Sequence, residues 1–261
     1  MTTNERPGLV IQERDLHLLR ELGTMRVIDR EQAKRVAGFG STTRANMRLL
    51  RLTEAGLLRR FFLGTTKGGA KALYTLSKLG AGLAQVPQRG PRRPSNRALV
   101  GDFFVQHQLA VNDVYCALRY RGLPPGIRFK SWRVFQKSVV PSLPLIPDGY
   151  AEFETPTRIV AAFVEVDLGH ERLKVWKEKA KAYFALTVSG AFEREFHQRR
   201  FRVLVIAHST GRMQSIRTAV APVTEKLFWY SSLPSIHERF FGAHWLRSQG
   251  DEPRSFFRET P

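Results

Sequence analysis

Apolar residues recur at helical spacing in three segments of the first sixty residues. These segments predict helices over residues 12–23, 29–37 and 42–55. Asp29, with Gln32 three positions later, is a capping pair for the second helix, and Ser41 can cap the third. Two short helices joined to a third through a glycine-containing turn are typical of a helix-turn-helix.

The pattern then changes to that of two strands. Residues 57–63 and 72–76 are mostly apolar, and the turn between them contains two glycines. Ser77 begins a short helix that ends near Ala84. Three helices followed by a hairpin predict a winged helix, in which the third helix enters the major groove of DNA and the hairpin follows the backbone.

The second half of the chain predicts a mixed sheet covered by helices. Short apolar segments predict strands at residues 127–135, 146–153, 159–167, 201–207 and 227–230. Helical spacing predicts helices at residues 99–120, 169–186 and 211–220. We therefore predict an α/β fold, α+β overall, in which a winged helix-turn-helix precedes a mixed-sheet domain.

A segment rich in proline and arginine separates the two halves. Residues 87–97 contain three prolines, one glycine and four arginines, which suit neither a helix nor a central strand. We predict a winged-helix DNA-binding domain over residues 1–86, then this linker, then an α/β domain over residues 98–261.

Positive charge is concentrated around the third helix and the hairpin. The formal net charge is +19, and residues 41–97 hold twelve Lys or Arg but one acid, Glu54. This concentration favours nucleic acid, because neutralising phosphates releases condensed counterions. A solubilising surface is the alternative, but it would carry interspersed acids. RNA is disfavoured as a partner, because no aromatic-rich stacking surface accompanies the basic segment.

The third helix and the hairpin supply the candidate DNA contacts. Residues near the start of the helix are candidate base readers, with the capping Ser41 beside them: Thr42, Thr43, Arg44 and Asn46. Long cationic side chains are candidate phosphate contacts: Arg48, Arg51, Arg59, Lys67 and Lys71. Phosphate contacts position a protein on DNA, whereas base contacts specify the sequence.

Three carboxylates near strand ends form a second candidate site. Asp148 lies seventeen residues before Glu165, which is followed by Asp167. This spacing resembles the PD-(D/E)xK nuclease core, where such acids bind a metal that activates water. Asp167 occupies the position of the motif's lysine, so the sequence disfavours nuclease activity. In a nuclease, Asp148 and Glu165 would hold Mg²⁺, and a lysine of the next helix would supply the ammonium, with Lys177 as the main candidate beside Lys174 and Lys181. Otherwise these acids are polar strand ends, and no cofactor is needed.

Cysteine content and hydropathy bear on the compartment. The one cysteine, Cys116, rules out an internal disulfide and lies among apolar residues, so we expect a buried thiol. The N-terminus shows no secretory signal, and no run approaches the ~20 apolar residues that cross a bilayer. These features predict a cytoplasmic protein without a membrane partner.

The order of motifs resembles the replication-relaxation family of mobile-element proteins. The matching segments, in chain order, lie at residues 14–19, 49–58, 74–80, 107–113, 147–148 and 165–169. Lys177 or Lys179, together with Tyr183, would complete the pattern. The resemblance implies a winged helix joined to a nuclease-like α/β domain, in proteins associated with plasmids or integrative conjugative elements.

Together these features predict a double-stranded DNA-binding protein of a plasmid or integrative conjugative element. We expect a transcriptional regulator or an accessory factor at an origin of transfer or replication. The second domain would then serve homodimerisation or contacts with a relaxase or other transfer proteins. The alternative is a metal-dependent PD-(D/E)xK-type nuclease that the winged helix targets to DNA.

Overall fold

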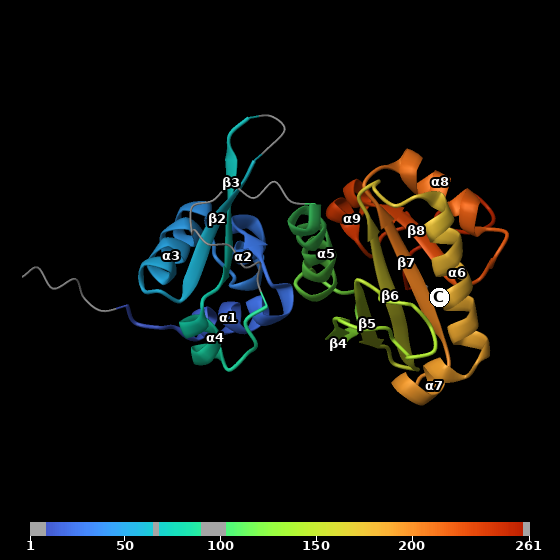
Figure 1. Cartoon of the computed structure of the whole chain (residues 1–261), viewed down its shortest axis with the longest axis horizontal. Helices are drawn as coiled ribbons and strands as arrows, with labels where there is room; N and C mark the ends of the chain where they lie inside the picture. Colours follow the sequence, from blue (N-terminus) through green and yellow to red (C-terminus); the bar gives the residue numbers. More distant parts are fainter. Residues whose placement is uncertain (1–8, 65–67, 90–102, 258–261) are drawn as a thin grey trace, which may run out of the picture. The chain divides into compact units, whose positions relative to one another are not determined.

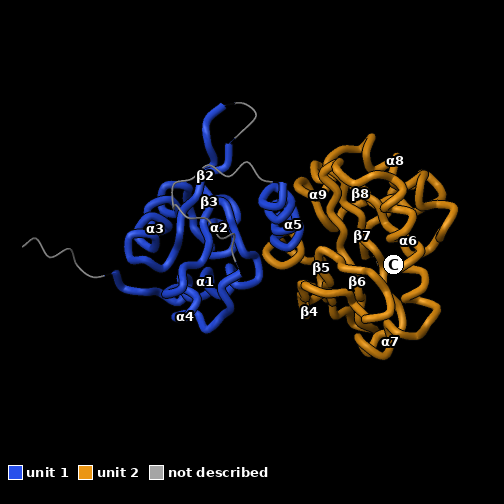
Figure 2. Tube along the Cα trace, in the orientation of Figure 1, with its two compact units in different colours: residues 1–116 blue, residues 117–261 orange. Residues whose placement is uncertain are grey.

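The alternating patterns of the sequence become helices and strands in the computed structural model, which describes residues 9–64, 68–89 and 103–257 (Figure 1). The chain divides into two compact units, residues 1–116 and residues 117–261 (Figure 2). Both contain helices and a sheet, so the predicted α+β class is confirmed.

Unit 1 contains helices around a small sheet. In chain order its described elements are α1 (Glu13–Met25), β1 (Ile28–Asp29), α2 (Arg30–Val36), α3 (Thr42–Glu54), β2 (Leu58–Gly64), β3 (Ala70–Leu76), α4 (Lys78–Ala84) and most of α5 (Phe103–Arg119). The predicted caps are present: Asp29 accepts a hydrogen bond from the Gln32 backbone at 2.8 Å, and Ser41 accepts one from the Arg44 backbone at 3.2 Å.

The three strands pair antiparallel in the order β1-β3-β2. The two-residue strand β1 is absent from the sequence prediction, because so short a segment has no periodicity to detect. Helix α3 buries one stripe of apolar side chains, formed by Ala45, Leu49 and Leu52. Its opposite side is therefore left for solvent or for a partner.

Helix α5 packs within unit 1, although the sequence placed it at the start of the second domain. Its Val105 and Leu109 join the buried cluster formed with residues of β2 and β3. The Asn112 amide donates to the backbone carbonyls of Met25 and Val27 at 3.1 and 2.6 Å. The division after Cys116 therefore differs from the predicted one at residues 97 and 98. The linker predicted at residues 87–97 lies outside the described residues from residue 90 onward.

Unit 2 is built on a six-stranded mixed sheet in the order β4-β5-β6-β7-β8-β9. Its strands are β4 (Arg128–Arg133), β5 (Gly149–Glu154), β6 (Ile159–Asp167), β7 (Phe201–Ala207), β8 (Phe228–Ser232) and β9 (Leu246–Arg247). Strands β6, β7 and β8 are parallel to one another, and the remaining pairs are antiparallel. Strand β6 lies inside the sheet, between β5 and β7.

Helices connect the strands of unit 2: α6 (Leu173–Val188), α7 (Ala191–Phe196), α8 (Thr210–Val220) and α9 (Leu233–Arg239). Along one face of the sheet, α6 and α8 bury Trp176, Tyr183 and Ile216 against side chains of β6 and β7 (Figure 1). The side chains of β6 alternate between the two faces, so Phe163, Glu165 and Asp167 all point toward this helical layer.

A close approach fixes one glycine at the beginning of β5. A Cβ atom at Gly149 would lie 2.2 Å from ring atoms of Trp132, so no larger residue fits there. Asp148 is the residue directly before Gly149. The close packing of Gly149 against Trp132 therefore fixes the backbone next to the Asp148 carboxylate.

Two further expectations concern burial and hydropathy. Cys116 is fully buried, and burial raises the pKa of its thiol to about 12, as expected for an inert core cysteine. Within the described ranges, no helix combines the length and the apolarity needed to cross a bilayer.

Candidate functional site

The outward side of α3 carries most of the predicted base readers. Thr43 and Arg44 are exposed at its first turn, while Ser41, Thr42 and Asn46 are half-buried. Arg51 is exposed two turns further along. Neither Arg44 nor Arg51 has an acidic partner within the part of the chain that the structure describes. This side of α3 therefore presents uncompensated positive charge.

Arg48, in contrast, does not face solvent. Its guanidinium forms an ion pair with Asp15 of α1, including a bond from Nε to Oδ1 of 2.9 Å. It also donates to the Val10 carbonyl at 2.6 Å. The side chains of Arg48 and Asp15 are 10% and 0% exposed. Arg48 therefore joins α3 to α1, and its predicted role as a phosphate contact does not fit this position.

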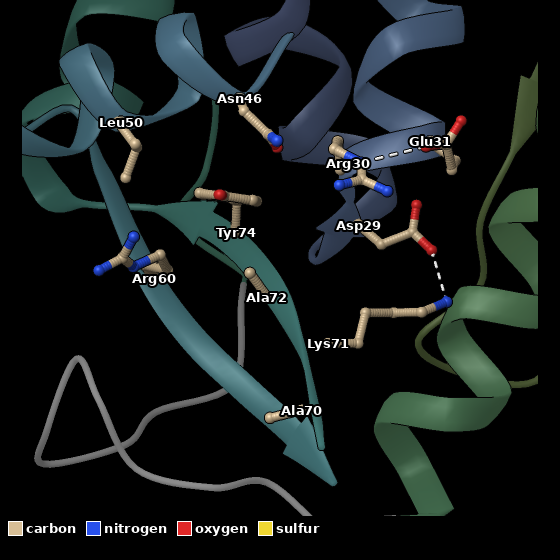
Figure 3. Close-up of a pocket in the computed structure, with 10 residues that line it drawn as sticks. All are labelled: Asp29, Arg30, Glu31, Asn46, Leu50, Arg60, Ala70, Lys71, Ala72 and Tyr74. Carbon is tan, nitrogen blue, oxygen red and sulfur yellow. Dashed lines mark hydrogen bonds and ion pairs between the residues drawn. The ribbon is translucent and has the colours of Figure 1, made fainter. Parts of the chain in front are cut away.

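The hairpin places Arg60, rather than the predicted Arg59, on the side of α3. Arg60 pairs across the sheet with Tyr74, and both line a hollow of about 450 Å³ between α3 and the hairpin (Figure 3). Asn46 and Leu50 of α3 line the same hollow. Because strand residues alternate, Arg59 points to the opposite face of the sheet.

The remaining cations of the hairpin differ in their surroundings. Lys71 lines the hollow, but its ammonium pairs with Asp29 at 2.9 Å, and its side chain is half-exposed (Figure 3). Part of its charge is therefore compensated inside the protein. Lys67 lies outside the described residues.

In unit 2 the structure brings Asp148 and Glu165 together. Gly149 of β5 pairs with Val164 of β6, and the two strands are antiparallel. Asp148, one residue before Gly149, therefore lies opposite Glu165. Its Oδ2 atom accepts a hydrogen bond from the Val166 backbone at 2.7 Å. The pairing of β5 with β6 thus places these two carboxylates beside each other.

Both oxygens of Glu165 are engaged by side chains of α6. The Tyr183 hydroxyl donates to Oε1 at 2.6 Å, and the Lys179 ammonium donates to Oε2 at 3.0 Å. Lys179 also pairs with Glu171 at 2.9 Å. The ammonium at this site thus comes from Lys179, whereas the predicted Lys177 is exposed on the helix.

Burial governs the ionisation of this cluster. Desolvation raises the pKa of Glu165 to about 7, against the opposing effect of Lys179 and with a further increase from Asp148. Burial alone would lower the pKa of Lys179, but Glu165 and Glu171 outweigh it and raise that pKa. The ammonium form of Lys179 is therefore favoured, while burial makes Glu165 a weaker acid than an exposed glutamate.

Asp167 is neutralised by a separate set of contacts. Arg212 of α8 donates to both of its oxygens at 2.8 and 3.0 Å, and the Trp176 indole donates at 2.9 Å. Burial opposes ionisation of Asp167, but the bonds from Arg212 and Trp176 outweigh it and lower its pKa. Asp167 is thus a structural anchor between β6 and α8.

The residues of this cluster do not fit a divalent cation such as Mg²⁺. Such a cation needs several free oxygen ligands, whereas both oxygens of Glu165 already accept hydrogen bonds, from Tyr183 and from Lys179. Among the described residues, no group of three or more His, Cys, Asp or Glu side chains is placed to hold a metal ion.

Arg60 and Arg212 are absent from the sequence prediction, whereas Lys179 enters it through the family resemblance as the alternative to Lys177. A strand of adjacent arginines does not show which one faces the helix, so the sequence gives no reason to prefer Arg60 to Arg59. Nothing near Arg212 in the sequence marks it as the partner of Asp167. Helical spacing holds the signal for Lys179, which lies three residues from Trp176 and four from Tyr183.

Comparison with known proteins gives one match. The family model described as Replication-relaxation matches residues 19–198, which is more than half of the chain and includes both α3 and the Asp148–Glu165 cluster. No curated protein and no solved structure matches.

Proposed function

Because the chain belongs to the replication-relaxation family, we propose that it binds double-stranded DNA through α3 and the β2–β3 hairpin of a winged helix. The family match supports a role in the replication of mobile elements. In this proposal α3 lies in the major groove, and the hairpin follows the phosphate backbone.

The exposed, uncompensated arginines of α3 carry the proposal. Arg44 and Arg51 lie on one edge of the exposed side of α3. On its other edge, Asn46 and Leu50 line the hollow together with Arg60 of the hairpin. Both edges of this side of α3 therefore have cations beside them. Phosphates flanking the major groove supply the complementary charge.

A salt titration of DNA affinity tests the proposal. Fluorescence anisotropy with a labelled duplex should give a steep fall of affinity with salt concentration. The Arg44→Ala/Arg51→Ala variant should weaken binding and flatten the slope of log K against log salt by about 0.9, the contribution of the phosphate contact at Arg51, while the loss of the base contact at Arg44 weakens binding further.

A charge-matched control separates this surface from net charge. Lys174→Ala/Arg199→Ala removes the same charge from exposed positions of unit 2 and should leave the slope unchanged. An equal loss in both double variants would refute α3 as the DNA-binding surface. Absence of duplex binding at low salt would refute the proposal altogether.

The biological setting follows from the family. We infer a cytoplasmic protein of a plasmid or integrative conjugative element, which acts as a transcriptional regulator or as an accessory factor at an origin of transfer or replication. Unit 2 would serve self-association or contacts with a relaxase or another transfer protein. If it mediates a homodimer, the DNA site should contain two half-sites about one helical turn apart.

The nuclease alternative rests on the ammonium of Lys179 beside Glu165, an arrangement that places a lysine near two carboxylates. The same contact argues against it, because it occupies the oxygen that a metal would need. Incubation of supercoiled plasmid with Mg²⁺ or Mn²⁺ decides the matter. Nicking that is lost in both Asp148→Asn and Glu165→Gln would establish the nuclease.

A further inference from the structure

Two apolar side chains lie exposed on the outward side of α3. Met47 is 51% exposed and Leu50 is 37% exposed, whereas Ala45, Leu49 and Leu52 already fill the core side of the helix. A single exposed apolar residue is common on protein surfaces. Two of them lie within one turn of a helix whose other exposed side chains are polar or charged, and this calls for an explanation.

Helical geometry places these residues at the centre of the outward side. Thr43, Met47 and Leu50 follow one another at spacings of four and three residues, so they form one continuous stripe. Arg44 and Arg51 flank Met47 on one edge of this stripe. On the other edge, Asn46 lies beside Leu50, and both line the hollow that faces Arg60 (Figure 3).

The surrounding charge decides which partner fits this stripe. A second copy of the same surface would bring two sets of the cations Arg44 and Arg51 to one interface, against a single exposed acid, Glu54, from each copy, and such an excess of like charge disfavours self-association. Duplex DNA offers the opposite charge together with one apolar group, the C5-methyl of thymine, which projects into the major groove.

We propose that Met47 and Leu50 are specificity-determining residues that contact thymine methyl groups in the major groove. This inference rests on the DNA binding proposed above and adds to it the composition of the preferred site. Met47 and Leu50 are separated by about 4.5 Å along the helix axis, given a rise of about 1.5 Å per residue. The two thymines they contact therefore lie within about two base pairs of each other.

Deoxyuridine substitution tests this contact, because it removes only the methyl group. The preferred site is first selected from a random duplex library, and each thymine is then replaced by deoxyuridine in turn. Burial of one methyl is worth about 0.8 kcal/mol, so wild-type affinity should fall about fourfold at the contacted thymines. The other thymines of the site should tolerate the change.

Variants assign the contacts to side chains. Met47→Ala should abolish the deoxyuridine effect at one thymine, and Leu50→Ala should abolish it at the other, as coupled partners do in a double-mutant cycle. Leu79→Ala is the matched control, since Leu79 of α4 is 61% exposed and outside α3, and it should leave both effects intact.

The outcomes separate this inference from the function on which it depends. Absence of binding to any duplex removes the proposed function and the inference together. Sequence-selective binding with deoxyuridine effects that persist unchanged in Met47→Ala and Leu50→Ala overturns the inference alone. Sedimentation equilibrium adds one more decisive result: a dimer that dissociates in these two variants would show that the stripe is a self-association surface instead.

Discussion

Arg48 and Arg51 lie on successive turns of α3, yet their surroundings predict different effects when each is replaced by alanine. Arg48→Ala removes the ion-pair partner of Asp15, whose side chain is completely buried. Removing one member of a buried pair typically costs about 3–5 kcal/mol, because a carboxylate remains without compensation. Asp15 keeps a bond of 2.7 Å from the Gln12 backbone, so we expect about 3 kcal/mol.

Arg51→Ala serves as the control. Its side chain is exposed, and surface substitutions of this kind usually change stability by no more than about 0.5 kcal/mol. It should instead flatten the salt dependence of DNA binding by about 0.9, the contribution of one phosphate. At a temperature where Arg48→Ala remains folded, that variant should keep the wild-type slope.

The distribution of tryptophan provides an internal reference for the stability measurement. The chain has four tryptophans, and all of them lie in unit 2, at positions 132, 176, 229 and 245. Urea denaturation followed by tryptophan fluorescence therefore reports on unit 2, while far-ultraviolet circular dichroism reports on both units. Arg48→Ala should shift only the part of the dichroism transition that fluorescence does not follow.

A double variant identifies the source of the loss. Asp15→Ala/Arg48→Ala removes the stranded carboxylate along with its partner and should recover part of the stability lost in Arg48→Ala. An unchanged dichroism transition in Arg48→Ala, combined with a flattened salt slope, would refute this reasoning and restore Arg48 as a phosphate contact.

Three further predictions concern packing, domain limits and pH. Gly80→Ala should destabilise unit 1 by about 1–3 kcal/mol, because the added Cβ would lie 2.1 Å from the Leu57 carbonyl oxygen. Gly82→Ala is the control: its Cβ would meet no atom within 4 Å, so thermal melts should show a neutral or stabilising effect. A fragment of residues 1–120 should unfold cooperatively in urea, and a fragment of residues 1–88 should not, because it lacks α5. Unit 2 should lose stability as pH rises from about 4.5 to about 7, because folded Glu165 keeps a proton that the unfolded chain releases. Glu165→Gln should remove this pH dependence from the unfolding transition that tryptophan fluorescence detects.

Local sequence signals account for much of unit 1. The caps at Asp29, Ser41 and Ser77 act on backbone groups within three residues, so a short pattern contains all the information needed. The buried stripe of α3 follows from helical period alone. These interactions are close in sequence, which is why the predicted helix boundaries agree with the structure to within a few residues.

The placement of α5 depends on interactions that no local pattern contains. Asn112 bonds to carbonyls 87 and 85 residues earlier in the chain, and Tyr115 donates to Glu21 across 94 residues. An amphipathic helix after a proline-rich segment could pack on either side of it. The composition of residues 87–97 therefore indicates a boundary in the sequence but does not determine where the folded units divide.

The lysine that pairs with Glu165 can be predicted in part from the sequence of α6. The helical phase that buries Trp176, Ala180 and Tyr183 puts Lys179 at the edge of the buried side and Lys177 well away from it. Helical phase alone therefore favours Lys179 over Lys177 as the lysine that faces the sheet. Helical phase does not show that Glu165 is buried, and a buried carboxylate needs a cation beside it.

Basic residues paired with carboxylates occur in both units, and Arg48 is the example on α3. In unit 2, Lys179, Arg212 and Arg217 each pair with a carboxylate, so their charge is spent on holding helices and loops to the sheet. On α3, Arg44 and Arg51 have no such partner among the described residues. Exposed cations of this kind contribute little to the stability of the fold. Phosphates that approach them would supply the opposite charge, which is what the proposed binding to DNA requires.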